Sequence, residues 1–156
     1  MSEKLQVEAI QNGTVIDHIP SGQGIRILKR LHLESDGKRI TVGLNLPSKN
    51  LGMKDLIKVE GWKFSAQEAD ELSLFAPDAT INVIDNYQVV TKHEMKLPDT
   101  LEGVFDCPNS NCISISEPVK SFFYISQGKQ SDANPSGVKM RCKYCEKSFS
   151  KDLVVA

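Results

Sequence analysis

Apolar and polar positions alternate through much of the first 95 residues, and this pattern predicts a series of short strands. Five segments have the alternation or the β-forming composition that strands require. They are KLQVEAI (4–10), RITVGLNLP (39–47), KDLIKVEG (54–61), ATINVID (79–85) and YQVVTK (87–92).

Two other segments of this region predict helices. Residues 22–34 carry apolar side chains at roughly helical spacing. Ser65 and Glu68 form a capping-box pattern, which opens a second helix over residues 66–76. The predicted order is β-α-β-β-α-β with one further strand. We therefore expect an α+β fold, namely a ferredoxin-like α/β sandwich in which two helices cover one face of an antiparallel sheet.

The pattern changes after residue 95. KLPDTLEG (96–103) contains a proline and a glycine and is typical of a connector. Short strands are predicted in VFDCPNSNCISI (104–115), SFFYISQ (121–127), VKMRCKYCEKSF (138–149) and DLVVA (152–156), and a polar loop in GKQSDANPSG (128–137). We therefore expect two domains, residues 1–98 and residues 99–156, the second small and all-β.

Composition and charge are ordinary for a soluble globular protein, with 40% apolar residues, 25% charged residues and a formal net charge of −1. No apolar run approaches the roughly 20 residues of a membrane span. The opening residues MSEKLQVEAI lack the charged-then-apolar order of a secretion signal. We therefore expect a cytoplasmic protein without membrane partners.

Signatures of an enzyme are missing from the sequence. Neither G-x-S-x-G nor G-x-x-x-x-G-K-[ST] occurs. The three histidines, His18, His32 and His93, are scattered along the chain, and an isolated histidine is more often solvated or structural than catalytic. The sequence predicts a protein that is not itself an enzyme.

All four cysteines lie in the second predicted domain, as Cys107-x4-Cys112 and Cys142-x2-Cys145. Paired cysteines in a reducing cytoplasm are more typical of a metal site than of disulfides. Four thiolates at about 2.3 Å suit tetrahedral Zn²⁺ and leave no position open for water, which indicates a structural ion. So small a domain buries little core, and a zinc-ribbon-like metal site would stabilise it. Iron in a rubredoxin-like site, two disulfides and four unrelated buried cysteines are the alternatives.

Several long stretches resemble one known family. LQVEAI, GTVIDHIP, ITVGLNLPS, KDLIKVE, APDATINVIDNYQVV and CPNSNCIS…EPV…CKYCEKSFS are similar, in order, to the regulatory chain of aspartate carbamoyltransferase. The resemblance implies a non-catalytic chain that pairs with itself and bridges trimers of a separate catalytic chain. It also implies an allosteric domain that binds CTP or ATP, with UTP as a further effector. The zinc domain is expected to contact the catalytic chain, and the controlled reaction, carbamoyl transfer to aspartate, belongs to pyrimidine synthesis.

The same resemblance implies roles for particular residues. Lys58 and Lys92 match phosphate and ribose contacts, and Asp17 and His18 match positions near the ribose and phosphates. The base would be lined by Val7, Glu8, Ala9, Ile10, Ile84, Tyr87 and Val89, with Asn82 as a polar contact. Without the resemblance, we would interpret either lysine as an ordinary surface charge. Val7, Ile10, Ile84 and Val89 would then be sheet core.

Two other pairs of polar residues enter the interpretation. Gln11 and Asn12 stand where the resemblance leads us to expect basic residues, which bears on nucleotide affinity. Asn109 and Asn111 lie between the first two cysteines and are either turn residues or contacts with the catalytic chain. We expect the latter.

The alternative function is a free-standing zinc-ribbon module that binds nucleic acid. Residues 101–156 contain seven Lys and Arg against six Asp and Glu, a net of +1. Such a small excess is a poor match for a phosphate backbone. We therefore expect no nucleic-acid partner.

Overall fold

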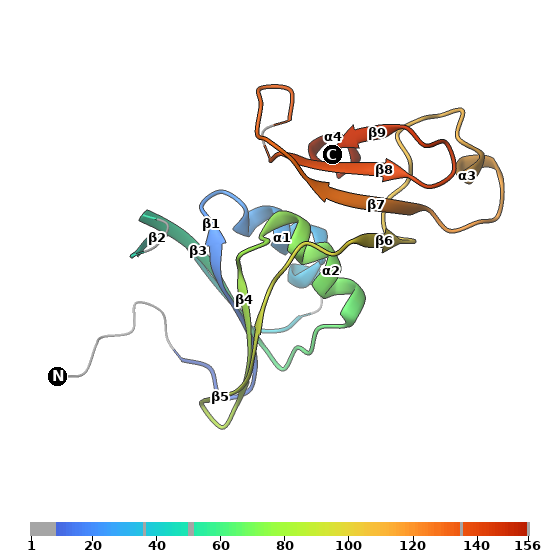
Figure 1. The fold of residues 1–156 in the computed structure, drawn as a ribbon. Coiled ribbons are helices and arrows are strands. Elements are labelled where there is room, and N and C mark those ends of the chain that lie inside the picture. Colours follow the sequence, from blue (N-terminus) through green and yellow to red (C-terminus); the bar gives the residue numbers. More distant parts are fainter. Residues whose placement is uncertain (1–8, 36, 50–51, 135, 156) are drawn as a thin grey trace. The chain divides into compact units, whose positions relative to one another are not determined.

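The computed structural model describes residues 9–35, 37–49, 52–134 and 136–155. The chain forms two compact units, Met1–Lys96 and Leu97–Ala156, and each has its own antiparallel sheet (Figure 1). Among the described residues, no helix has the length and apolar character needed to cross a membrane.

The first unit contains a five-stranded sheet in the order β2-β3-β1-β4-β5, with every neighbouring pair antiparallel. Its elements are β1 (Gly13–Pro20), α1 (Gly24–Arg30), a 3₁₀ turn (Leu33–Ser35), β2 (Ile40–Ser48), β3 (Gly52–Glu60), α2 (Ala66–Phe75), β4 (Thr80–Asp85) and β5 (Gln88–Glu94). The first four strands have the order of a ferredoxin-like sheet, and β5 extends it at the β4 edge. The predicted α+β class is confirmed.

One face of this sheet forms the main core with the helices. Ile16, Ile57 and Ile81 lie side by side on β1, β3 and β4, and each is fully buried. Figure 1 shows α1 and α2 on one side of the sheet, where Ile27 and Leu72 are also buried. On the opposite face, the described residues include a small apolar cluster around Ile10, Val15 and Leu56.

Helix α2 begins as predicted. The Ser65 hydroxyl accepts a hydrogen bond from the Glu68 N–H at 3.1 Å, and the Glu68 carboxylate accepts one from the Ser65 N–H at 3.0 Å. This reciprocal pair satisfies two backbone donors that a helix start otherwise leaves without partners. The local sequence signal was sufficient here because both partners lie within one turn.

The first strand differs from the prediction. Residues 4–8 of the predicted strand lie outside the described residues, and Ala9 and Ile10 are not in a strand. Strand β1 instead covers residues 13–20 and contains a bulge, where the register with β3 shifts between Ile16 and Ile19 and His18 has φ 59°. No strand was predicted over residues 13–20, where the extra residue at the bulge breaks the period-two pattern on which strand predictions depend.

The second unit contains a four-stranded sheet in the order β6-β7-β8-β9. Its elements are β6 (Thr100–Glu102), α3 (Ile113–Ser116), β7 (Phe122–Gln127), β8 (Val138–Cys142), β9 (Ser148–Ser150) and α4 (Lys151–Val154). The buried side chains of Leu101, Phe123 and Met140 form its apolar centre. The strands predicted in residues 121–127 and 138–149 are confirmed, the second as two strands joined by a turn.

Three details of this unit were predicted wrongly. Residues 104–115 contain no strand and end in the single turn of α3, whereas the presumed connector contains β6. The terminal segment forms the helix α4 over Lys151–Val154, because the Ser150 hydroxyl caps it by accepting a hydrogen bond from the Leu153 N–H at 3.3 Å. A cap thus outweighs the β-forming composition of that segment.

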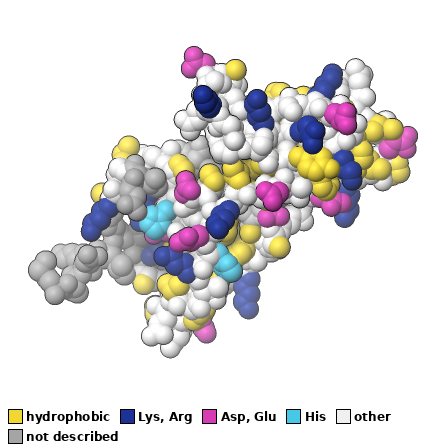
Figure 2. Space-filling model, in the orientation of Figure 1, with side chains coloured by type: hydrophobic (Ala, Val, Ile, Leu, Met, Phe, Trp, Pro, Cys, Tyr) yellow, Lys and Arg dark blue, Asp and Glu magenta, His cyan; other side chains and the backbone are white. Residues whose placement is uncertain are grey.

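The loop between β7 and β8 is closed at its base. The Gly128 N–H donates to the Gly137 carbonyl at 2.7 Å, and the buried Asn134 amide donates to the Val138 carbonyl at 3.2 Å. Residues 129–133 are exposed. On the face of the molecule shown in Figure 2, basic and acidic side chains are interspersed.

A buried carboxylate joins three segments of the first unit. Asp55 on β3 is fully buried, and its two oxygens accept hydrogen bonds at 3.0 Å from the N–H groups of Gly22, Gly24 and Asn45. The carboxylate therefore holds the β1–α1 turn and the irregularity in β2 against β3. Gly24 has no room for a side chain, because a Cβ there would lie 2.9 Å from the Asp55 Cβ.

Replacing Asp55 should destabilise the first unit. Asp55→Asn leaves at least one buried N–H without an acceptor, which costs about 1–3 kcal/mol of unfolding free energy, and Asp55→Ala removes all three acceptors and should cost more. Urea unfolding can be followed through Trp62, the single tryptophan, which is buried in this unit. The exposed Asp85→Asn is the control, and equal stability of the Asp55 and Asp85 variants would contradict the role of Asp55.

Candidate metal centre and open sheet face

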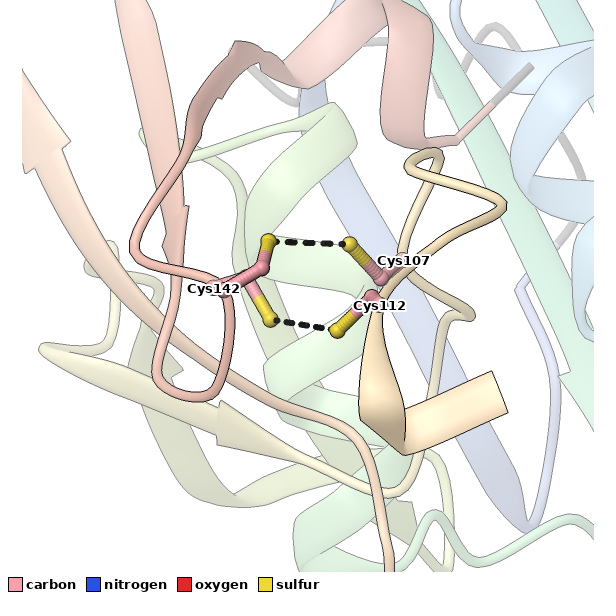
Figure 3. Close-up of side chains that lie close together, drawn as sticks. Cys107, Cys112 and Cys142 are labelled. Carbon is pink, nitrogen blue, oxygen red and sulfur yellow. Dashed lines mark hydrogen bonds between the residues drawn. The ribbon is translucent and has the colours of Figure 1, made fainter. Parts of the chain in front are cut away.

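The four cysteines converge on one point of the second unit. Cys107 and Cys112 flank the loop before α3, Cys142 ends β8, and Cys145 follows in the turn to β9. Their Sγ atoms all lie within 4.8 Å of one another. The Cys107–Cys145 and Cys112–Cys142 sulfur pairs are 3.7 and 3.6 Å apart, and Figure 3 shows the sulfurs turned toward a common centre. All four thiols are free.

This geometry fits a tetrahedral metal ion. Four sulfurs at about 2.3 Å from one ion are separated by about 3.8 Å, close to the two cross-pair distances. A disulfide would need about 2 Å instead. The predicted cluster is therefore formed, and its four soft donors suit a thiophilic ion with no coordination position left for water.

Backbone amides support each sulfur at the same offset. Against the raising effect of burial, a backbone N–H two positions later in the chain lowers the pKa of each thiol, namely that of Asn109 for Cys107, Ser114 for Cys112, Tyr144 for Cys142 and Lys147 for Cys145, and the Cys145 N–H does the same for Cys142. Such N–H donors favour the thiolate, which is the form that binds a metal. A supporting N–H at this offset thus occurs at all four cysteines, although the two cysteine pairs differ in spacing.

The four thiols nevertheless differ in acidity. Burial raises the pKa of Cys107 to about 12, and it also raises the pKa of Cys142. Burial acts in the same direction on Cys112, but the hydroxyl and N–H of Ser114, together with the thiols of Cys142 and Cys145, lower that pKa to about 7. The Ser114 hydroxyl lies 3.0 Å from the Cys112 sulfur, a contact that the sequence analysis missed.

The nucleotide-site residues predicted on strands share the face of the first sheet that lies away from the helices. Val15 pairs directly with Lys58 on one side and with Asn82 on the other, and Asn82 pairs with Lys92. Directly opposed residues of antiparallel strands point to the same face. The register therefore puts Lys58, Asn82 and Lys92 in one row across β3, β1, β4 and β5.

Adjacent rows add further predicted residues to this face. Ile84 pairs with Val89 on one side of the row, and Asp17 pairs with Thr80 on the other. Lys58 is 8% exposed and engaged in the fold, whereas Lys92 is exposed. The two cations thus have different surroundings.

The bulge at His18 shapes one end of the row. The His18 Nδ1 lies 2.8 Å from the Thr80 hydroxyl, and Asp17 accepts a hydrogen bond from the His18 N–H at 2.7 Å. Lys54, which the sequence analysis did not single out, forms an ion pair with Asp17 at 2.9 Å. A cavity of about 650 Å³ opens here, with His18, Thr80 and Lys92 among its lining residues.

The segment before β1 is hydrogen-bonded to the turn of the β4–β5 hairpin. The Tyr87 N–H donates to the Gln11 carbonyl at 3.0 Å, and the Asn86 N–H donates to the Asn12 side chain at 3.2 Å. Asn86 and Tyr87 both have positive φ, as a two-residue hairpin turn requires, and Tyr87 is exposed. The Asn12 side chain therefore has a structural use where a basic residue was expected, whereas the Gln11 bond uses the backbone carbonyl, which any residue would supply.

These two hydrogen bonds bring the predicted residues that precede β1 to the same face of the sheet. Ile10 is buried against Val15 and Leu56, with Ile84 packed beside them, and Ala9 is exposed. Val7 and Glu8, also predicted to line the base, lie outside the described residues. Ile10 and Ile84 thus belong to the sheet core, as the alternative interpretation held, and also border the row.

The asparagines of the metal loop have unequal exposure. Asn111 is exposed, whereas Asn109 is half-buried and its side-chain oxygen accepts a hydrogen bond from the Asn111 N–H at 3.1 Å. Burial raises the pKa of the Cys145 thiol, but the Lys147 N–H and, after it, the Asn109 side chain act against burial, and the pKa of that thiol is lowered.

Comparison with known proteins covers both units. Residues 5–96 match the family model "Aspartate carbamoyltransferase regulatory chain, allosteric domain", and residues 99–155 match "Aspartate carbamoyltransferase regulatory chain, metal binding domain". The chain belongs to the aspartate carbamoyltransferase regulatory chain family. It is thus the allosteric regulatory polypeptide and not a catalytic one, as the resemblance implied.

Relatives in this family are similar over their whole length. The regulatory chain of Tolumonas auensis is 58% identical over 158 residues, covering 99% of this chain and 97% of the relative. That of Chromobacterium violaceum is 57% identical over 148 residues, covering 95% and 93%. That of Aeromonas salmonicida is 55% identical over 156 residues, covering 99% and 97%.

The acidity of the cysteines predicts that metal affinity increases with pH. Cys107, with a pKa of about 12 in the metal-free chain, is protonated near neutrality and must lose its proton on binding. Affinity should therefore rise at least roughly tenfold per pH unit between about pH 6.5 and 8. Titration with Co²⁺, followed by thiolate-to-cobalt absorbance, measures this slope, and an affinity independent of pH would contradict it.

Proposed function

We propose that this regulatory chain binds CTP and ATP on the open face of its first unit, with UTP as a further effector. A structural Zn²⁺ at the four cysteines would shape the second unit for contact with the catalytic chain of aspartate carbamoyltransferase. The controlled reaction is carbamoyl transfer to aspartate in pyrimidine synthesis. A reducing cytoplasm, in which the four thiols stay free, is the proposed location.

The row formed by Lys58, Asn82 and Lys92 is the observation that supports the nucleotide site. Three strand spacings of about 4.8 Å separate the two lysines, so their backbones are about 14 Å apart. An extended nucleoside triphosphate spans this scale and needs cations for its phosphates and polar groups for its ribose and base. Asn82, with one donor side and one acceptor side, lies between the two cations.

The neighbouring residues complete this proposed site. The cavity at His18 and Lys92 provides room beside the row, and the Lys54–Asp17 ion pair borders it. Ala9, Ile10, Ile84, Tyr87 and Val89 supply apolar surface and backbone groups on the other side, where we propose that the base lies. Backbone N–H and C=O groups there would distinguish an exocyclic amino group from a keto group.

Zinc is the ion that best matches the metal centre. The centre has four thiolates and no open position, which is the arrangement of structural zinc sites. Tetrahedral thiolate sites also hold iron, so metal analysis of the purified chain is the direct test. The second unit has only a small apolar centre, and metal binding would contribute to its folding free energy.

Exposed apolar side chains support a partner surface near the metal. Ile113, Ile115 and Val119 are 55%, 49% and 42% exposed, and they follow the metal loop that carries the exposed Asn111. Apolar side chains gathered beside polar ones are typical of a protein interface. We propose that this surface, with Asn111 and the loop around Asn109, contacts the catalytic chain.

We also propose that the chain pairs with a second copy of itself. Strand β2 is an edge of the first sheet, and Leu44 on β2 and Met53 on β3 are 45% and 53% exposed. An edge strand with exposed apolar residues favours association with another chain. Sedimentation of the isolated regulatory chain would test this pairing.

Substitution of either lysine of the row should weaken nucleotide binding and leave assembly intact. Lys58→Ala or Lys92→Ala removes a charge-assisted contact, which costs about 1.5–3 kcal/mol, or roughly ten- to a hundredfold in CTP affinity. The matched control is Lys29→Ala, because Lys29 lies on α1, which packs on the sheet face opposite the row. Calorimetry with CTP measures the effect, and unchanged affinity in both row variants would refute the assignment.

Removing the metal should separate the two proposed activities. A mercurial reagent that competes for the thiolates should unfold the second unit, because its shape depends on the ion. The first unit has its own core and contains none of the four clustered cysteines, so it should still bind CTP. Association with the catalytic chain should be lost and should return with Zn²⁺.

Three measurements on one sample test this expectation, namely metal content, CTP binding and co-sedimentation with the catalytic chain. Metal-free protein that still co-assembles normally would show that the ion does not organise the partner surface.

A further inference from the structure

A second cavity of the first unit lies mainly on the sheet face opposite the row. Its volume is about 390 Å³, which is within the range of small-molecule sites, and Trp62 and Val83 are among its lining residues. Val83 pairs with Thr14, one position along the strands from the open-face pair of Val15 and Asn82, so Val83 and Thr14 point to the helix side. The buried Thr14 hydroxyl donates to the Trp62 carbonyl at 2.6 Å and holds the segment after β3 against the sheet.

Two glycines keep this space open. Gly13 begins β1 with φ 143°, and a Cβ there would collide with the Val59 carbonyl oxygen, so a larger residue does not fit. Gly61 has φ 72°, and a Cβ there would meet no atom within 4 Å. The Gly61 N–H donates to the Asn12 carbonyl at 3.1 Å, which fixes the two sides of the cavity to each other. The cavity is therefore preformed, and a ligand would bind without ordering the backbone first.

A bulge in the β4–β5 hairpin forms a further wall. Val83 pairs with Thr91 and Ile84 pairs with Val89, so Val90 is an extra residue without a direct partner on β4. Val90 lines the cavity and is 57% exposed. Bulges are over-represented beside functional sites, where they redirect a side chain. An exposed valine directed to a cavity in this way is consistent with a binding surface.

The lining combines an apolar interior with one charge of each sign. Lys63 and Asp85 are exposed and supply a cation and a carboxylate. A triphosphate needs several cations, and Lys63 is the only one among the described lining residues. A zwitterion matches better, because its carboxylate can pair with Lys63 and its ammonium group with Asp85. The apolar side chains that would receive the rest of the ligand are those of Trp62, Val83, Ile84 and Val90.

We propose that this cavity binds a free α-amino acid with an apolar or aromatic side chain. The inference goes beyond the proposed nucleotide site, because Ile84 is the only residue common to the two sets. It gives the first unit a second ligand site, reached from the other face of the same sheet. Aspartate, the substrate of the catalytic chain, should not bind here, because its charged side chain would enter an apolar interior.

Trp62 reports directly on occupation of the cavity, because it is the single tryptophan of the chain and lines the site. The full-length chain is titrated with L-phenylalanine, L-leucine and L-aspartate, and both tryptophan emission and calorimetric heat are recorded. The first two should give a saturable change, and L-aspartate should give none. Two probes test the charges: 3-phenylpropanoate lacks the ammonium group and 2-phenylethylamine lacks the carboxylate. Each should bind roughly two- to fivefold more weakly than L-phenylalanine, as expected for exposed ion pairs.

Three variants assign these contacts to particular residues. Lys63→Ala should weaken L-phenylalanine roughly two- to fivefold but should not weaken 2-phenylethylamine, and Asp85→Asn should show the same selectivity with 3-phenylpropanoate. Val90→Phe fills part of the cavity and should weaken L-phenylalanine roughly ten- to a hundredfold. Lys29→Ala, which removes an exposed cation of α1, is the control and should bind normally. Urea unfolding of each variant checks that it is folded.

The opposing results are equally specific. Absence of both heat and emission change with L-phenylalanine and L-leucine would overturn the site. Equal affinity for L-phenylalanine and 3-phenylpropanoate would show that the ammonium group is not recognised, which refutes the assigned ligand class. Unchanged affinity in folded Val90→Phe, or weaker binding in Lys58→Ala, would place the ligand outside this cavity and also overturn the inference.

Discussion

The convergence of four sulfur atoms is the constraint on which the second unit depends. Cys107 and Cys112 precede the main strands, whereas Cys142 and Cys145 follow them, so the cluster can form only when β7 and β8 are paired in register. The apolar centre contains few side chains, and bringing distant segments together costs conformational entropy. A bound ion would offset that cost at the point where the two ends of the unit meet.

The first unit depends on strand register in a comparable way. Strand β3 presents Lys58 to the open face and Asp55 to the buried side, where its carboxylate holds the β1–α1 turn and β2. A slip of one residue would turn Lys58 into the core and expose Ile57. The same alternation that builds the core therefore aligns the row of polar side chains across the sheet.

Local and short-range features were the predictable part of this structure. The capping box of α2 and the cysteine spacing were sufficient signals for the prediction, because the partners, or the ligand pairs, lie close in sequence.

Features that depend on distant residues were missed. The bulge at His18 interrupts the alternation of β1, and the ion pair between Lys54 and Asp17 joins residues on different strands. The roles of the nucleotide-site residues stay predictions, although the register shows that those on the strands share a face.

The closed base of the β7–β8 loop has a consequence for protein engineering. The hydrogen bond between Gly128 and Gly137 and the amide of Asn134 hold the strand ends, so the exposed residues 129–133 carry little of the pairing. Lengthening a loop costs little entropy, about 0.6 kcal/mol for each doubling. A peptide tag or a fluorescent label placed between Lys129 and Gln130 would therefore leave the register of Gln127 with Val138, and the cysteines beyond it, undisturbed.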